Sequence, residues 1–236
     1  MKKVWLGFLI GLCLFVTFEL GGLARDLADQ NTGSRGMFAP GQVQPQLRVH
    51  RRCDVNFSIT NWGFLGSQSW NLHESPGCLF CDHPNESVQA PSFEFPSNSG
   101  LEYLFEGALW VGGVVEGETL VTVGASGWWW IYEWAPASDI IEREWMGDQE
   151  CLAVFTDTIV PPPLTETPES TDWDRREHRP LHVEVTQRSY SWQSPPFDDF
   201  VILDYTVRNT GDRSISQAYL GFFLDTDVLG LRESYY

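Results

Sequence analysis

Four tryptophans within seven positions are the residues whose chemistry would most directly serve binding. Trp128, Trp129 and Trp130 are consecutive, and Trp134 follows them. A flat indole face can stack on a sugar ring while nearby carboxylates accept hydrogen bonds from its hydroxyls, so this cluster is a candidate glycan-binding site. The same rings could instead pack a core or contact another protein. Because side chains alternate along a strand, at least one face of the cluster should be buried.

Two aspartates near the C-terminus could begin a calcium site. Asp225 and Asp227 are two positions apart at the end of a predicted strand, and Asp198 and Asp199 could add ligands from another strand. An EF-hand would need a glutamate at its twelfth position, where this chain has Tyr236. These aspartates therefore form either a calcium site or a solvated turn. No other cofactor is expected.

Four cysteines follow the N-terminal segment. They are Cys53, Cys78, Cys81 and Cys151, and an even number in an exported chain favours disulfides. The favoured pairing is a tight Cys78–Cys81 loop with a long Cys53–Cys151 staple, although other pairings are open. Free thiols, a metal site with neighbouring histidines and a redox-active pair remain alternatives. The Cys78–Cys81 pair lies in a loop rich in proline and glycine, whereas redox pairs usually open a helix.

No catalytic motif in the sequence identifies an enzyme. His178 and His182 beside Glu184 could suggest a metalloprotease, but Pro180 separates the histidines, and a zincin needs both on one helix face. There is no Gly-x-Ser-x-Gly elbow and no glycine-rich phosphate loop. Carboxylate pairs suited to glycoside hydrolysis arise by chance in so acidic a chain. The sequence therefore leans away from an enzyme, and an exported hydrolase remains an alternative.

The composition favours a folded β protein. The chain has 236 residues, and 32 acidic against 15 basic side chains give a formal net charge of −17. This acidity argues against a nucleic-acid partner, which requires clustered lysine and arginine. The 21 glycines, 14 prolines and 11 tryptophans favour strands and loops over long helices. We expect a mostly β, antiparallel β-sandwich-like fold with long irregular loops.

The N-terminus has the three parts of a secretory signal peptide. Two lysines supply the positive start, Val4–Phe18 is an uncharged and mostly apolar run, and small residues surround a predicted cleavage site after Ala24. Glu19 ends this run before the roughly 20 residues of a membrane-spanning helix, and an uncleaved anchor is the alternative. We expect a secreted or cell-surface protein with no membrane insertion after cleavage.

Changes in composition divide the chain into segments. They are a signal peptide at 1–24, a flexible leader at 25–52, a β-rich region with a tryptophan-containing hairpin at 53–160, a proline-rich loop or linker at 161–180 and sandwich-like strands at 181–236. Within the β-rich region, Ala108–Val115 and Thr119–Gly124 flank a short turn at Glu116–Glu118, which predicts a hairpin.

The last segment has the most regular strand pattern. Leu181–Trp192 alternates, Asp199–Arg208 follows, and Ala218–Leu224 is the next predicted strand. Alternation in the second of these strands should put one set of apolar residues on a single face, namely Val201, Leu203, Tyr205 and Val207. If further strands lie beyond Tyr236, we expect an incomplete sandwich with an unpaired apolar edge.

Six short segments form a distinctive set. They are Ile59–Gly66, Phe93–Pro96, Ser99–Gly113, Gln187–Trp192, Asp198–Gly211 and Tyr219–Val228. Together they resemble the opening of large exported bacterial proteins that use type IX secretion. The longer relatives that this resemblance points to often end in fibronectin-type-III-like modules and a C-terminal sorting domain. By this resemblance, the present chain would be a fragment of such a protein. The resemblance implies an export route and an architecture, and the family has no agreed enzymatic activity to carry over to this chain.

These observations predict an exported, non-enzymatic structural or adhesive module at the N-terminal end of a larger surface or secreted protein. A glycan-binding module that uses the cluster from Trp128 to Trp134 is one alternative, and an exported hydrolase is the other. The expected partner is a glycan or a surface protein.

Overall fold

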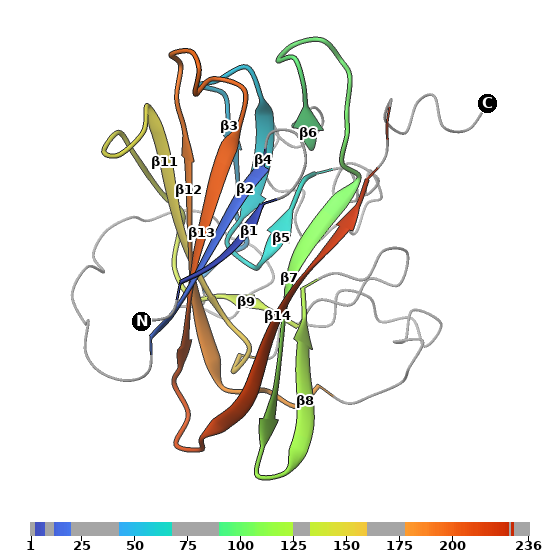
Figure 1. Cartoon of the computed structure of the whole chain (residues 1–236), viewed down its shortest axis with the longest axis vertical. Coiled ribbons are helices and arrows are strands. Elements are labelled where there is room, and N and C mark those ends of the chain that lie inside the picture. Colours follow the sequence, from blue (N-terminus) through green and yellow to red (C-terminus); the bar gives the residue numbers. More distant parts are fainter. Residues whose placement is uncertain are drawn as a thin grey trace.

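The computed structural model describes residues 3–7, 12–19, 43–67, 90–124, 133–159, 178–226 and 228. Its fourteen strands form two sheets of seven strands each, and the described residues include no helix (Figure 1). Neighbouring described strands are antiparallel, with one parallel pair, β2 beside β13. The expected mostly β, sandwich-like fold is therefore confirmed. None of the described residues belongs to a helix that could span a membrane.

The first sheet, sheet A, runs in the order β1, β2, β13, β12, β11 and β10, with β9 also beside β11. Its strands are β1 (Lys3–Gly7), β2 (Leu12–Glu19), β9 (Ala135–Pro136), β10 (Ile141–Arg143), β11 (Gln149–Thr156), β12 (Val183–Ser191) and β13 (Val201–Asn209). The apolar run Val4–Phe18, predicted to be part of a signal peptide, contributes most of β1 and most of β2. Its removal would take both strands out of sheet A.

The second sheet, sheet B, runs in the order β14, β7, β5, β4 and β3, with β8 beside β7 and β6 beside β4. Its strands are β3 (Leu47–His50), β4 (Asn56–Thr60), β5 (Phe64–Leu65), β6 (Phe93–Glu94), β7 (Glu106–Val115), β8 (Glu118–Val123) and β14 (Ile215–Asp225). The predicted flexible leader at 25–52 contains a strand near its end, because β3 lies within it and pairs with β4.

The predicted hairpin is present as β7 and β8. Val115 lies opposite Glu118, so the turn between them consists of Glu116 and Gly117. Both turn residues have positive φ, 51° and 85°. Two central residues of positive φ match the twist of antiparallel strands and close a tight hairpin.

Alternating side chains of the two sheets meet in one core. In β13 the inward-facing residues Val201, Leu203, Tyr205 and Val207 are at most 4% exposed, as the strand pattern predicted. Opposing residues from sheet B include Phe57, Ile59, Leu65 and Leu109, each fully buried.

The proline-rich segment predicted at 161–180 lies between two paired strands of sheet A, and its residues 161–177 lie outside the described residues. β11 precedes it and β12 follows it, yet these two strands pair over eight positions. Sheet B likewise takes β14 from the last segment of the chain and its other strands from earlier segments. The regions predicted at 53–160 and 181–236 therefore share both sheets.

Candidate functional site

Trp134, predicted as a member of a binding cluster, is a core residue. Its side chain is 1% exposed, and its ring meets that of Phe155 edge-on at 5.3 Å between centroids. The indole Nε1–H donates a hydrogen bond of 3.0 Å to the carbonyl oxygen of Leu109. Trp134 cannot offer its ring to a glycan here, because its apolar area is already used between the sheets. Trp128, Trp129 and Trp130 lie outside the described residues.

Of the two aspartates that would begin the predicted calcium site, Asp225 is described. Asp225 ends β14 opposite Glu106, and its carbonyl oxygen accepts a hydrogen bond of 2.8 Å from the Phe105 amide. Asp227 lies outside the described residues. Within the described ranges, no three histidine, cysteine or acidic side chains gather closely enough to hold a metal ion.

The predicted Cys53–Cys151 staple is not formed, and both residues are free thiols. Cys53 Sγ donates to the carbonyl oxygen of Val55 at 2.9 Å. Cys151 lies on β11 opposite Ser189 and is fully buried, and this burial raises the pKa of its thiol to about 12. Cys78 and Cys81 lie outside the described residues.

A buried histidine links the sheets close to these thiols. His50 ends β3 in sheet B, and its ring nitrogens Nδ1 and Nε2 lie 2.9 Å from Ser191 Oγ and 2.7 Å from Ser189 Oγ of sheet A. The imidazole is fully buried, and burial lowers its pKa to about 3. A neutral ring that both donates and accepts satisfies both hydroxyls, so this group stabilises the packing of the sheets.

The two histidines that could suggest a metalloprotease have separate environments. His178 Nδ1 lies 3.1 Å from Glu133 Oε1, and His178 Nε2 lies 3.0 Å from the carbonyl oxygen of Asp157. Burial works against protonation of His178, but its contacts with Glu133 and Asp157 outweigh burial and raise its pKa. His182 has a φ of 59°, and its carbonyl oxygen accepts a hydrogen bond of 2.8 Å from the Thr210 amide. Neither histidine lies on a helix, which agrees with rejection of the zincin motif.

A neighbouring pair of glutamates carries opposite pKa shifts, a pattern that can mark acid–base catalysis. Burial raises the pKa of Glu102. Burial opposes ionisation of Glu94 as well, but hydrogen bonds from the Gly100 amide and Asn56 outweigh it and lower the pKa of Glu94. Both carboxylates accept main-chain N–H groups, which for Glu102 are the amides of Ser92 and Phe93. These bonds give both acids a role in holding the loop around β6.

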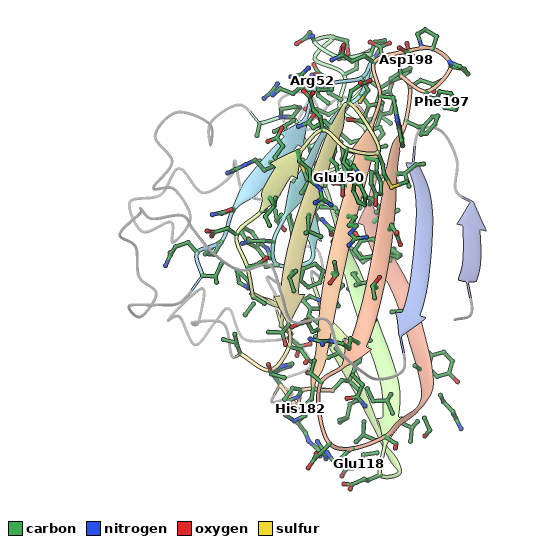
Figure 2. All side chains as sticks on the ribbon, turned by 90° about the vertical axis from the view of Figure 1, so that its left-hand side faces the viewer. Arg52, Glu118, Glu150, His182, Phe197 and Asp198 are labelled. Carbon is green, nitrogen blue, oxygen red and sulfur yellow. The ribbon has the colours of Figure 1, made fainter. Side chains whose placement is uncertain are left out.

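Five apolar residues, three of them well exposed, lie at one end of sheet A, and we call this group the aromatic shelf. It consists of Trp145 and Met146 from the β10–β11 connection and Trp192, Phe197 and Phe200 from the β12–β13 connection. Trp145 is 65% exposed, Met146 62% and Phe197 53%. Figure 2 shows Phe197 and Asp198 at this end of the sandwich, with His182 and Glu118 at the opposite end. Exposed large apolar side chains that gather in one region commonly mark an interaction surface.

Three rings of the shelf, those of Trp192, Phe197 and Phe200, contact one another. The Trp192 ring stacks on that of Tyr190, with 6.3 Å between ring centroids. The Trp192 centroid lies 6.4 Å from that of Phe197 and 6.1 Å from that of Phe200. Phe197 and Phe200 meet edge-on at 6.1 Å. Because Tyr190 belongs to β12, these contacts anchor the three rings to the sheet.

Hydrogen bonds join the two connections that carry the shelf. Trp192 Nε1–H donates to the carbonyl oxygen of Met146 at 3.0 Å. The Asp148 amide donates to Ser191 O at 2.9 Å, and the Gln193 amide donates to Asp148 Oδ2 at 2.7 Å. At Gly147 an added Cβ would lie only 2.7 Å from Ser191 O, so the connections approach too closely for a larger residue. The two connections are therefore held together before any ligand binds.

Charged groups border the shelf. The Arg143 guanidinium lies over the Trp145 ring, 4.7 Å from its centroid, and also pairs with Glu150 at 2.9 Å. Arg52 pairs with Glu144 at 3.4 Å, both well exposed. Flat apolar faces beside fixed hydrogen-bonding groups can bind a ligand that has both apolar and hydroxylated surfaces.

Sequence reasoning missed the shelf. Trp145 stands among charged residues, and Phe197 follows a pair of prolines, so neither fits a strand pattern. Local sequence offers one signal, a tryptophan at the end of the alternating run from Leu181 to Trp192. The pairing of β11 with β12 is what brings the two connections together, and this depends on contacts distant in sequence.

No protein-family model, curated protein or solved structure matches the chain.

Proposed function

We propose that this protein is an exported, non-enzymatic adhesive module that binds carbohydrate through its aromatic shelf. The resemblance to proteins of type IX secretion supports the export route and a position at the N-terminal end of a larger surface or secreted protein. The sandwich-like fold supports the module character, since loops at one end of a rigid β scaffold commonly carry binding residues.

The observation that carries this proposal is the exposure of Trp145 and Phe197 on connections fixed by hydrogen bonds. Pyranose rings have apolar C–H faces that pack on aromatic rings, and their hydroxyls need hydrogen-bonding partners at the rim. Arg143, Glu144 and Arg52 provide such partners beside Trp145. The proposal therefore moves the predicted glycan site from Trp134, which is buried, to the shelf.

The test is binding of the exported chain to cellulose, chitin, mannan and xylan, measured as depletion from solution at increasing polysaccharide concentration. Trp145→Ala should weaken the strongest interaction about tenfold or more, equivalent to the ~1.4 kcal/mol of one stacking contact. Tyr219→Ala is the matched control, because Tyr219 is also 65% exposed but lies on β14 of sheet B.

Tyr219→Ala should bind like the natural chain. The carbohydrate proposal fails if the natural chain binds none of the four polysaccharides. It also fails if Trp145→Ala binds as tightly as the natural chain.

A further inference from the structure

The strand β13 has neighbours on both sides in the whole chain. On one side it pairs antiparallel with β12 from Val183↔Asn209 to Tyr190↔Ile202, with no break in register. On the other side β2 pairs parallel with it from Val201↔Leu12 to Arg208↔Glu19. Figure 1 shows β1 and β2 as blue strands beside β13 at this border of sheet A.

Cleavage after Ala24 would remove β1 and β2 and uncover the backbone edge of β13. Strand edges of natural proteins are usually protected by proline, a bulge, inward-pointing charge or short length. β13 is nine residues long, contains neither proline nor glycine, and places Val201, Leu203, Tyr205 and Val207 inward. Such an edge readily accepts another strand.

We propose that a second copy of this chain covers this edge, with the two β13 strands paired antiparallel about a two-fold axis at Thr206. This inference rests on the proposed export, because the signal peptide must leave before the edge is available. The antiparallel arrangement continues the pattern of sheet A, in which β10, β11, β12 and β13 are all antiparallel neighbours.

Charge complementarity selects the register. With the axis at Thr206, Asp204 faces the partner's Arg208, and Arg208 faces the partner's Asp204. A shift of the axis to Asp204 would instead set two carboxylates opposite each other, which is unfavourable across a strand pair. On the inward face the chosen register puts Tyr205 beside the partner's Val207, so the apolar layer continues across the axis.

The charges already present on β12 extend this pattern. Glu184 pairs with Arg208 at 2.6 Å, and Arg188 lies opposite Asp204 on the neighbouring strand. Across the dimer the row would therefore run Glu184, Arg208, the partner's Asp204 and the partner's Arg188, with alternating sign at each step. Alternating charges on adjacent strands stabilise strand pairing.

The test uses the whole chain, expressed with its own N-terminus in a bacterial host and purified after export. Intact mass reports whether residues 1–24 are gone, and light scattering during size-exclusion chromatography reports the oligomeric state. Thr206→Asp and Thr206→Lys each place like charges at the axis, so each alone should be monomeric. An equal mixture of the two variants should recover the dimer, because the opposite charges then meet.

The matched control is Thr186→Lys. Thr186 lies directly opposite Thr206 on β12, on the same half-buried outer face, but at no free edge. This variant should remain dimeric. Its thermal unfolding, together with that of the Thr206 variants, shows that every chain is folded.

Three results would overturn the dimer: a processed natural chain that is monomeric, a dimer that survives both Thr206 variants, or a mixture that stays monomeric. A monomer of the processed chain leaves the edge to a strand of another protein and does not touch the carbohydrate proposal. Retention of residues 1–24 contradicts the proposed export and also ends the dimer proposal, because β2 then keeps its place.

Discussion

At the scale of single residues, the same side-chain type has opposite roles according to where the fold places it. Trp134 points between the sheets and is 1% exposed, whereas Trp145 lies on the shelf and is 65% exposed. The sequence identifies both as large aromatic residues but does not show which of them is buried, because the burial of each depends on how the strands pair. The two tryptophans should therefore respond differently to truncation.

Trp134→Ala should lower the free energy of unfolding by about 3–5 kcal/mol, because it leaves a large cavity and an unpaired Leu109 carbonyl. Trp145→Ala should change this free energy by no more than about 0.5 kcal/mol, as is usual for exposed positions. Urea unfolding followed by far-ultraviolet circular dichroism measures both. Equal losses for the two variants would show that the burial assigned to Trp134 or Trp145 is incorrect.

The thiol of Cys151 should be unreactive in the folded protein. Its pKa is raised to about 12 by burial, so almost no thiolate exists at pH 8. Iodoacetamide at pH 8, followed by peptide mass mapping, should leave Cys151 unmodified until urea is added. A disulfide between Cys53 and Cys151 in the purified protein, or rapid labelling of native Cys151, would contradict this account.

His50 should make the protein less stable in acid. Its folded-state pKa of about 3 lies below the ordinary 6.5 of an unfolded histidine, so the unfolded chain binds the extra proton between these values. His50 therefore contributes a loss of stability as pH falls from about 6.5 toward 3, at no more than ~1.4 kcal/mol per pH unit. Urea midpoints at several pH values should fall more steeply for the natural chain than for His50→Gln. Equal slopes would contradict a neutral, buried His50.

At the scale of strands and turns, the sequence pattern predicted those elements that form between residues close together in the chain. The β7–β8 hairpin could be predicted because a glycine-bearing turn separates two apolar runs. The inward face of β13 could be predicted because its alternation is regular. β3 could not be predicted in this way, because Leu47–His50 is short. It forms a strand by pairing with β4. The shelf depends on two connections that meet only after β11 and β12 pair.

The hairpin turn offers a prediction at this scale. Gly117 has a φ of 85° and no atoms within reach of an added Cβ, so a side chain there would suffer backbone strain without a clash. Gly117→Val should therefore lower stability by roughly 1–3 kcal/mol. Glu116→Asn should be neutral or slightly stabilising, because asparagine tolerates positive φ in such turns. Thermal unfolding measures both, and an unchanged Gly117→Val would contradict the assigned turn geometry.

At the scale of the whole molecule, the proposed contacts use one end and one side of the sandwich. The aromatic shelf occupies the end with the β10–β11 and β12–β13 connections, and the edge of β13 becomes available when the predicted signal peptide is removed. A two-fold dimer through β13 would carry two shelves. Two weak carbohydrate sites on one particle would bind a polymeric surface more tightly than either site alone.

The measurement that tests the central claim most directly is a nuclear magnetic resonance titration of the indole N–H signals with hexasaccharides of cellulose, chitin, mannan and xylan. Signals of Trp145 and Trp192 should shift with at least one sugar, while that of buried Trp134 should stay unchanged. Shifts confined to Trp128, Trp129 and Trp130, or no shift at Trp145 with any sugar, would contradict binding at the aromatic shelf.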